Sequence, residues 1–414
     1  MSRCVCVFEA LKTATDDRQD ISLGLFRSDY MVHVDPTAAE GVASSVKQVE
    51  FNTIASSFGG LSSQVSAMHK HLLSINAFPP GCDSVIKSSA LPPSNSVPAL
   101  AHGLSDGHQA YGRSRTGHPL CVLFLVQSPE RNVFDQRHLE YALLTNHGVK
   151  SFRLHFHDIL RYTRIDSNRS LIYTPPHARG QPFEVSVVYF RAGYSPADYL
   201  DKADWDARLH VERSMAIKCP SILTHLAGSK KVQQVLATPH SPHLGRFLPD
   251  ETKAAKLRKT FAPIYPLDKS EAGLEARKMA QDAETAQRYV LKPQREGGGN
   301  NVYRKAIPDF LKSLPESHWP AHILMEMIEP PALTNVIFRN GEIQRGGVIG
   351  ELGVYGVCLW KNRINGGMHT GVAQTLQNYE AGYLLRTKGD QSEEGGVAAG
   401  FGAVDSVCLV DGPP

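Results

Sequence analysis

The sequence lacks any run of about 20 apolar residues, the length that a membrane-spanning helix needs. Its first apolar stretch, Val5 to Phe8, is too short for the core of a signal peptide. The seven cysteines are scattered along the chain and include no Cys-x-x-Cys pair, so neither a disulfide framework nor a zinc site is expected. These absences predict reduced thiols in a cytoplasmic protein that does not act at a membrane.

A strong excess of charge of either sign is also missing. The formal net charge is +3 and the basic residues are dispersed, which gives little reason to expect a nucleic-acid partner. With 42% hydrophobic and 21% charged residues, the chain has the composition of a globular protein. Its 414 residues predict two to three domains, at roughly 100–200 residues each.

Two common phosphate-binding motifs are absent. No Gly-x-x-x-x-Gly-Lys-Ser/Thr loop occurs, and Gly400-Phe401-Gly402 begins a Gly-x-Gly-x-x-Gly pattern without its third glycine. A nucleotide site in this chain therefore belongs to another architecture.

The most informative stretch is Lys292 to Asn301, which reads Lys-Pro-Gln-Arg-Glu-Gly-Gly-Gly-Asn-Asn after a short β-prone run. Its glycines allow positive φ angles and a close approach of the backbone to a ligand. Lys292 and Arg295 add positive charge and Glu296 adds a carboxylate, which together suit a nucleotide phosphate with Mg²⁺. A plain surface loop is the alternative, and the adjacent charges favour the phosphate site.

A compact α/β stretch is expected between residues 120 and 190. Leu120 to Val126 reads as a buried strand, Phe134 to Asn146 as a helix, and Phe152 to Phe156 and Val185 to Phe190 as later strands. This order predicts a parallel sheet, in which ligands bind beyond the carboxyl ends of the strands. The polar residues at or near such ends are Asn132, Gln136 and Arg191.

Further polar residues lie on other expected strands. Val49 to Ile54 alternates apolar and polar residues, which places Glu50 and Asn52 on one face as two oxygen ligands. Glu351 lies in a glycine-flanked strand, and Leu384 to Lys388 adds two cations. Each alone has an ordinary alternative, as a solvated strand residue or an exposed cation.

Together these segments resemble the eukaryotic glutathione synthetases, which are ATP-grasp ligases. The matching segments follow the family order and are LGLFRSDYM (23–31), FNTIASSFGGL (51–61), ERNVFDQR (130–137), YFRAGY (189–194), CPSILTHLAGSKKVQQ (219–234), YVLKPQREGGGNN (289–301), ILMEMIEP (323–330), ELGVYG (351–356), LLRTK (384–388) and GGVAAG (395–400). The resemblance implies an α/β (α+β) ATP-grasp fold with an inserted parallel-sheet α/β substrate-binding domain. The implied division is 1–117 for the N-terminal part of the catalytic domain, 118–228 for the substrate-binding domain and 229–414 for the ATP-grasp domain with its lid loops.

The resemblance also implies the reaction. Such an enzyme joins γ-glutamylcysteine to glycine through an acyl phosphate and converts ATP into ADP and phosphate, with Mg²⁺ as cofactor. It acts on small molecules, as a cytoplasmic homodimer, and not on nucleic acid or membranes. A carboxylate is a poor electrophile and needs such activation, and phosphoryl transfer relies mainly on positioning and charge stabilisation.

The resemblance further implies roles for individual residues. The implied Mg²⁺ ligands are Glu50, Asn52 and Glu296. The implied nucleotide contacts are Lys230, Lys292, Pro293, Gln294, Arg295, Glu296, Gly297, Gly298, Gly299, Asn300, Asn301, Tyr303, Met325, Glu326, Met327, Ile328, Glu351, Lys388 and Glu394. The implied dipeptide and glutathione contacts are Arg27, Ile54, Ala55, Ser56, Ser57, Asn132, Gln136, Arg191, Ala192, Gly193, Tyr194, Arg386, Val397 and Ala398. Arg27, Lys292 and Arg386 are the implied catalytic residues.

Some features depart from the family pattern. The segment before Leu23 is shorter than usual, so part of the family's scaffold is expected to be missing, with effects on stability and dimerisation. Ala55 stands where many relatives carry serine. Two alternatives remain: a ligase for another acceptor such as β-alanine, or a catalytically impaired, N-terminally truncated relative that only binds nucleotide. The small residues Ala398 and Ala399 fit the glycine-using type.

Overall fold

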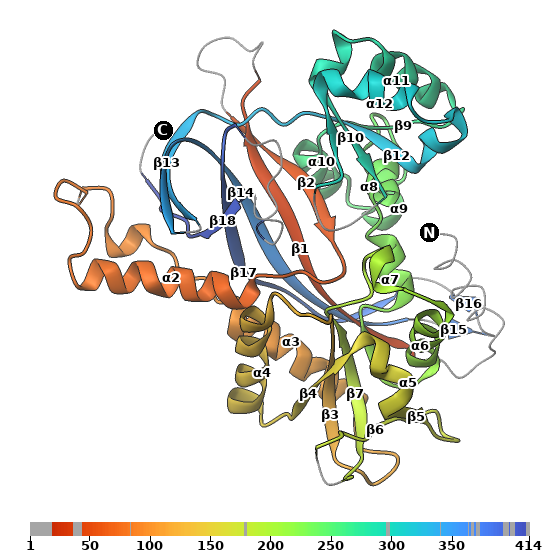
Figure 1. Ribbon diagram of the computed structural model, residues 1–414. Helices are drawn as coiled ribbons and strands as arrows, with labels where there is room; N and C mark the ends of the chain where they lie inside the picture. Colours follow the sequence, from red (N-terminus) through yellow and green to blue (C-terminus); the bar gives the residue numbers. More distant parts are fainter. Residues whose placement is uncertain are drawn as a thin grey trace.

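The computed structural model describes residues 19–35, 44–82, 84–177, 180–294, 299–339, 341–362, 364–365, 368–369, 373–391, 397 and 402–410. Three larger sheets organise these residues (Figure 1). A long sheet crosses the middle of the molecule, a mainly parallel sheet lies at the bottom of the view, and a small sheet with its helices lies at the top right.

The long sheet is antiparallel throughout. Its order is β18 (Gly402–Asp405), β17 (Gln374–Gly389), β14 (Glu342–Lys361), β1 (Ile21–His33) and β2 (Ser45–Asn52), and β13 (Leu333–Arg339) also pairs with β14. The period of two along β1 places Leu23, Leu25, Arg27 and Asp29 on one buried face. Register then sets Arg27 opposite Asn52 on β2 and Glu351 on β14 opposite Arg386 on β17.

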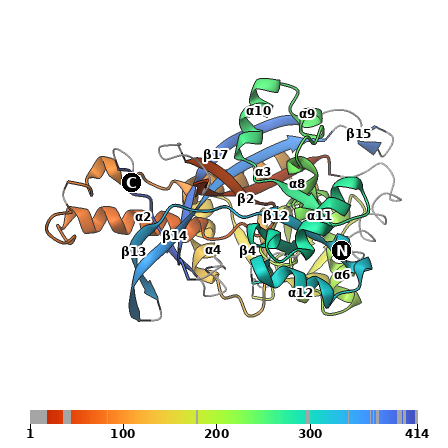
Figure 2. The same ribbon diagram turned by 90° about the horizontal axis from the view of Figure 1, so that it is seen from above.

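The strand expected at Val49–Ile54 differs from the observed one. β2 begins earlier, at Ser45, and ends at Asn52. Residues 53–58 instead form a turn that leads into α2 (Gly59–Ser74), a helix that projects from one side of the molecule (Figure 2). Ile54 to Ser57 therefore reach the site from a turn and not from a strand.

The mainly parallel sheet confirms the expected β-α-β order. β4 (Ser151–His155), β3 (Leu120–Val126), β7 (Phe183–Phe190) and β8 (Ile217–Cys219) are parallel, and α4 (Val133–His147) connects β3 to β4. The short β5 (Thr163–Ile165) and β6 (Leu171–Tyr173) add an antiparallel edge that the sequence did not indicate. α5 (Ile159–Tyr162), α6 (Lys202–Arg213) and α7 (Ile222–Ala227) complete this region.

The small sheet has the order β11 (Val302–Tyr303), β10 (Tyr289–Pro293), β12 (His322–Glu326) and β9 (Ile264–Pro266), all antiparallel. Its helices are α8 (Lys230–Ala237), α9 (Leu244–Phe247), α10 (Glu251–Thr260), α11 (Glu271–Gln281) and α12 (Ile307–Lys312). β9 lies between α10 and α11 in the sequence. Met31 of β1 and Val49 of β2 pack against the apolar cluster of the small sheet, which joins it to the long sheet.

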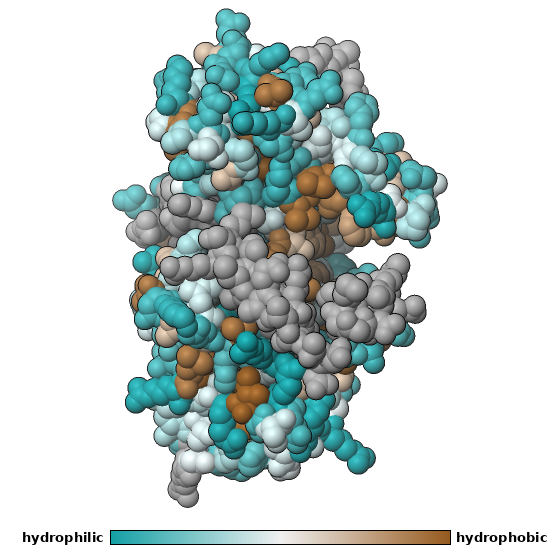
Figure 3. Space-filling model, turned by 90° about the vertical axis from the view of Figure 1, so that its right-hand side faces the viewer, coloured by the Kyte–Doolittle hydropathy of each residue, from teal (hydrophilic) through white to brown (hydrophobic). Residues whose placement is uncertain are grey.

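The largest core cluster lies where α3 (Ser96–Tyr111) packs between the long and the parallel sheets. Leu23 of β1, Leu104 of α3 and Val187 of β7 are all fully buried in it. The face on the right-hand side of Figure 1 is mostly hydrophilic, with apolar groups gathered in a recess near its middle (Figure 3). Every helix in the described ranges is too short or too polar to cross a membrane.

Candidate active site

A cavity of about 860 Å³ opens where the long sheet meets the small sheet. β1, β2, β14 and β17 contribute to one side of it, and β10 and β12 to the other. Most of the residues predicted for the site line this cavity, and they are Arg27, Glu50, Asn52, Ile54, Ala55, Ser57, Tyr194, Lys230, Lys292, Asn300, Asn301, Tyr303, Met325, Glu326, Met327, Ile328, Glu351, Arg386, Lys388 and Val397. Residues far apart in sequence thus meet around one space.

The charged group beside the cavity centres on Asp29, whose side chain has no exposed surface. Its Oδ1 accepts a hydrogen bond from Nε of Arg27 at 2.6 Å, and its Oδ2 accepts one from Nη2 of Arg27 at 2.8 Å. Oδ2 also accepts from Nη2 of Arg386 and from Nδ2 of Asn52, both at 3.0 Å. Arg386 forms a second ion pair with Glu351. Four strands of the long sheet therefore contribute to one network.

The guanidinium of Arg27 is held by Asp29 on one side and by the turn before α2 on the other. Its Nη1 donates to the carbonyl oxygen of Ser57 at 3.2 Å, and the hydroxyl of Tyr355 donates to the same oxygen at 2.6 Å. Burial by itself would lower the pKa of Arg27, but the charge and hydrogen bonds of Asp29 outweigh burial and raise that pKa. The guanidinium therefore stays charged at the edge of the cavity.

Glu50 lies among the cations that were predicted to contact nucleotide. Its Oε2 is 3.7 Å from Nζ of Lys230, and Nζ of Lys292 donates to the carbonyl oxygen of Val49 at 3.2 Å. Burial alone would raise the pKa of Glu50, but Lys230 and Lys292 outweigh burial and hold that pKa well below its usual range. Glu50 is thus an ionised carboxylate close to two ammonium groups.

The opposite wall of the cavity is partly apolar. Met325 and Ile328 are buried against Val290 and Ile264 in the cluster under the small sheet, and both also line the cavity. The sequence allows Met325 and Met327 to belong to the core, to an adenine pocket or to both. In the structure Met325 is buried in this cluster, Met327 packs against it, and both line the cavity. An apolar wall close to polar groups suits a flat aromatic base.

Only part of the glycine-rich loop can be placed. Pro293 pairs with His322, and Oε1 of Gln294 accepts from the backbone N–H of Lys231 at 2.9 Å. Pro293, Gln294 and Gly299 are not among the residues that line the cavity. Arg295, Glu296, Gly297, Gly298, Glu394 and Ala398 lie outside the described residues, so their predicted roles remain predictions.

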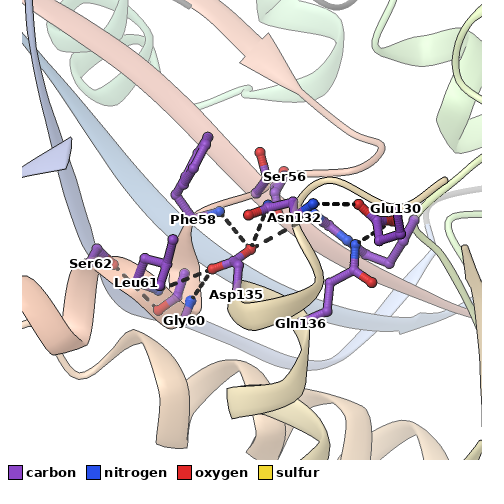
Figure 4. Close-up of polar contacts among 12 residues, drawn as sticks. Ser56, Phe58, Gly60, Leu61, Ser62, Glu130, Asn132, Asp135 and Gln136 are labelled. Carbon is purple, nitrogen blue, oxygen red and sulfur yellow. Dashed lines mark hydrogen bonds and ion pairs between the residues drawn. The ribbon is translucent and has the colours of Figure 1, made fainter. Parts of the chain in front are cut away.

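The turn before α2 is held by Asp135 of α4 (Figure 4). Its Oδ2 accepts from the N–H of Phe58 at 2.8 Å, and its Oδ1 accepts from the N–H groups of Gly60 at 2.6 Å and Leu61 at 3.1 Å. These N–H groups at the start of the helix have no partner within it, and a carboxylate there also compensates the helix dipole. Asp135 thereby fixes the turn that carries Ile54 to Ser57.

A second group of predicted substrate residues lies behind this turn. Nη1 of Arg191 donates to the carbonyl oxygen of Ser56 at 2.8 Å, and its buried Nε has no hydrogen-bond partner among the described residues. Gln136 donates to Glu130 at 2.8 Å and accepts from Arg153 at 2.8 Å. Among the described residues outside the glycine-rich loop, the predicted ones that do not line the cavity are Ser56, Asn132, Gln136, Arg191, Ala192 and Gly193.

Sequence reasoning missed Asp29, Asp135 and Glu130. Asp29 follows Arg27 at a spacing of two, so it shares a strand face with it, which was a usable signal. Asp135 and Glu130 lie inside the matching segment 130–137, where no local pattern distinguishes them from the other charged residues. The described part of the chain contains no group of three His, Cys, Asp or Glu side chains arranged for a metal, which leaves the predicted set of Glu50, Asn52 and Glu296 untested.

Comparisons with known proteins agree on one family. The family model for the eukaryotic glutathione synthase ATP-binding domain matches residues 1–409. The chain is similar to the glutathione synthetase large chain of Schizosaccharomyces pombe, at 39% identity over 94% of this chain and 76% of that one. It is also similar to the glutathione synthetase of Homo sapiens, at 40% identity over 94% of this chain and 75% of that one. The chloroplastic glutathione synthetase of Solanum lycopersicum is 39% identical over 95% of this chain and 65% of that one.

The comparison of folds gives the same architecture. The apo structure of a glutathione synthetase-like effector from Globodera pallida superposes with a TM-score of 0.69, over 99% of this chain and 80% of that one, at 21% identity. At 21% identity, this similarity shows the fold alone. The predicted α+β ATP-grasp class is confirmed.

Proposed function

This chain belongs to the eukaryotic glutathione synthase family and is an ATP-dependent ligase, and we propose that its cavity joins γ-glutamylcysteine to glycine. The observation that carries the proposal is that two lysines, Lys230 and Lys292, line the same cavity as Arg27 and Arg386. Ammonium groups neutralise phosphates, and guanidinium groups bind carboxylates and phosphoryl oxygens in a planar, directed way. Such a site can hold a phosphate donor next to a carboxylate.

The proposed chemistry follows from the poor reactivity of a carboxylate. The cysteinyl carboxylate of the dipeptide attacks the γ-phosphorus of ATP, the bond to the β-phosphate oxygen breaks, and an acyl phosphate and ADP result. The amine of glycine then attacks the acyl carbon, phosphate leaves, and the amine gives up a proton. Since phosphoryl transfer depends mainly on positioning and charge stabilisation, a site rich in fixed cations needs no nucleophilic side chain.

We assign the nucleotide to the side formed by the small sheet. Lys230 and Lys292 would meet the phosphates, and Met325 to Ile328 would contact the base. Arg295 to Gly298, which lie outside the described residues, keep their predicted role as nucleotide contacts. Support for this side comes from the ionised Glu50, whose pKa both lysines lower, and from the apolar wall of the cavity.

We assign the dipeptide to the side formed by the long and the parallel sheets. Arg27 and Arg386 would meet the reacting carboxylate, and Arg191 with Asn132 and Gln136 would meet the γ-glutamyl end. The bond from Arg191 to Ser56 supports this, because it connects the second group to the turn that lines the cavity.

The donor set fits Mg²⁺ as the cofactor. Glu50 is an ionised carboxylate, and the N–H groups of the Asn52 amide are engaged by Asp29 and the carbonyl oxygen of Arg27. The amide oxygen of Asn52 and the Glu50 carboxylate are hard ligands that suit this ion, and Glu296 is the third proposed ligand. When bound, Mg²⁺ neutralises charge on the ATP phosphates.

We further propose a cytoplasmic homodimer that acts on small molecules and not on nucleic acid or membranes. The scattered cysteines support the compartment, and the modest net charge supports the absence of a polyanionic partner. The division at residues 117 and 228 and the dimer itself rest on the family resemblance. Sedimentation of the purified chain tests the dimer.

The function is tested by leaving out one reaction component at a time. Purified protein is incubated with ATP, Mg²⁺, γ-glutamylcysteine and glycine, and ADP and glutathione are quantified by mass spectrometry. One glutathione per ADP is expected, and only when every component is present. β-alanine replaces glycine in a parallel reaction, and a preference for it would reassign the acceptor. Nucleotide binding without any amide product would contradict the proposal and leave an impaired relative.

A further inference from the structure

Two arginines from strands that are not neighbours converge on one carboxylate. Arg27 lies on β1 and Arg386 on β17, with β14 between them. Both donate to Asp29, and Nη2 of Arg386 reaches the same Oδ2 that accepts from Nη2 of Arg27. Without a shared anion, two like charges this close would repel each other and move apart.

Asp29 itself does not meet a ligand. Its side chain has no exposed surface, and it is not among the residues that line the cavity. Both of its carboxylate oxygens are already engaged by site residues, with four hydrogen bonds at 2.6–3.0 Å. Any effect of Asp29 on the reaction is therefore exerted through the residues that it holds.

Both arginines that Asp29 holds line the cavity. Nη2 of Arg386 is shared between Asp29 and Glu351, while its buried Nε has no hydrogen-bond partner among the described residues. A buried N–H without a partner is costly unless a ligand completes it. Arg27 extends past Asp29 to the carbonyl oxygen of Ser57, in the turn that lines the cavity.

Asn52 is oriented by the same carboxylate. Its Nδ2 donates to Oδ2 of Asp29 at 3.0 Å and to the carbonyl oxygen of Arg27 at 3.3 Å. An amide whose nitrogen is held in this way presents its oxygen on the other side. Asp29 therefore explains why an amide stands at position 52, since an aspartate there would set two carboxylates against each other.

We propose that Asp29 is the positioning residue of this site: it holds Arg27 and Arg386 side by side for the reacting carboxylate and turns the oxygen of Asn52 toward the cavity. This inference rests on the proposed ligase function and adds to it a residue that touches no substrate. The competing view is that Asp29 only neutralises buried arginines, in which case its loss would change stability and leave the kinetics of the folded enzyme intact.

The first variant is Asp29→Asn, which keeps the size of the side chain and removes its charge. We expect kcat/KM for γ-glutamylcysteine to fall about 10- to 100-fold, as for other residues that orient ligand-binding side chains without touching the ligand. KM for ATP should change less, because Lys230 and Lys292 come from α8 and β10 and not from the strands that Asp29 connects. Calorimetric titration with γ-glutamylcysteine gives a readout that does not depend on turnover, and weaker binding is expected there too.

The matched control is Glu184→Gln on β7. Glu184 is another fully buried carboxylate, and it accepts hydrogen bonds from Tyr111, Ser114 and Thr116, remote from the cavity. This variant should lower the melting temperature and leave both KM values unchanged. If Asp29→Asn behaves in the same way, the positioning role is wrong.

Asn52→Asp covers the case in which Asp29→Asn fails to fold. A carboxylate is at least as good a Mg²⁺ ligand as an amide, so a role confined to metal binding predicts retained activity. Positioning by Asp29 predicts a loss of activity in Asn52→Asp, because the two carboxylates face each other. It also predicts partial recovery in the double variant Asp29→Asn/Asn52→Asp, where one acid and one amide are present again.

The outcomes separate the two claims. If the wild type is active and Asp29→Asn has unchanged kinetics, the positioning role alone is overturned. If Asp29→Asn does not fold, unchanged kinetics in Asn52→Asp overturns it instead. A folded wild type that makes no glutathione overturns the proposed function, and the positioning role falls with it.

Discussion

The guanidinium of Arg191 donates a hydrogen bond to the carbonyl oxygen of Ser56 at 2.8 Å. This bond connects the carboxyl end of β7 in the parallel sheet with the turn that follows β2 in the long sheet. Asp135 holds the same turn from α4, and its carboxylate lies 3.9 Å from Nη2 of Arg191. The side of the site that we assign to the dipeptide is thus shared between two sheets, while the side that we assign to the nucleotide is built on the small sheet.

Replacing Arg191 should therefore affect the two substrates unequally. We expect Arg191→Ala to raise KM for γ-glutamylcysteine at least tenfold, because a bidentate cation and a support of the turn are both lost. KM for ATP should change less than twofold. Steady-state kinetics with each substrate varied in turn measures both values, and an equal rise for both would indicate a general loss of structure instead.

Lys230 and Lys231 offer a matched pair on α8. Lys230 is buried beside Glu50 at 3.7 Å and lines the cavity, whereas Lys231 is more exposed and faces Asp268 at 3.4 Å. We expect Lys230→Met to raise KM for ATP about tenfold or more, since phosphate charge is no longer neutralised. Lys231→Met should leave KM for ATP unchanged. Similar values for the two variants would remove Lys230 from the nucleotide site.

Gly353 on β14 allows the close approach of Arg27 and Asp29. A Cβ atom at this position would lie 2.7 Å from Cδ of Arg27 and 2.8 Å from Oδ1 of Asp29, closer than packed atoms lie. We expect Gly353→Ala to displace this pair and lower turnover about tenfold or more, as misplacement of a positioned group does.

Gly350 on the same strand provides the control for that substitution. Its Cβ would lie 3.6 Å from the side chain of Leu385, an ordinary van der Waals distance. Gly350→Ala should therefore retain wild-type turnover. Equal activity of the two variants would show that the space at Gly353 is not needed.

Stability in acid should depend on Glu184. Burial alone would raise the pKa of this carboxyl, but hydrogen bonds from Tyr111, Ser114 and Thr116 outweigh burial and lower the pKa from 4.5 to about 2. Because the folded form binds its proton less readily than the unfolded form, this contribution is complete above pH 4.5 and is lost as the pH falls toward 2. The difference in melting temperature between wild type and Glu184→Gln should shrink as the pH falls from 4.5 toward 2 and should persist at neutral pH. A difference in melting temperature that does not change with pH would show that Glu184 does not make this contribution.

Local patterns were enough to predict the strands and the helix of the β3–α4–β4 unit, because buried strands and their connecting helix have clear periodicities. They did not reveal β9, whose three residues lie between two charged helices and pair with β12, a strand distant in sequence. The contact of Asp29 with Arg27 could be read from their spacing, but its contact with Arg386 could not. β17 lies two strands away from β1, and register over more than 350 residues cannot be read from a local pattern.

The meeting of Lys230, Lys292 and Glu50 was expected only through the family resemblance, since nothing local relates a strand near residue 50 to a helix near residue 230. The structure brings the three together in one cavity. For the glycine-rich loop the sequence is more informative than the structure. The sequence pattern predicts its role strongly, whereas residues 295–298 lie outside the described part of the chain.

The central claim is that the site activates the cysteinyl carboxylate by phosphorylation, and oxygen transfer tests it most directly. γ-Glutamylcysteine labelled with ¹⁸O in the cysteinyl carboxylate is converted in unlabelled water with ATP, Mg²⁺ and glycine. The mass of the released phosphate is then measured. Attack by the carboxylate on the γ-phosphorus predicts one ¹⁸O atom in each phosphate formed alongside glutathione. Phosphate without label would contradict the account, because ATP would then have been cleaved without activating the dipeptide.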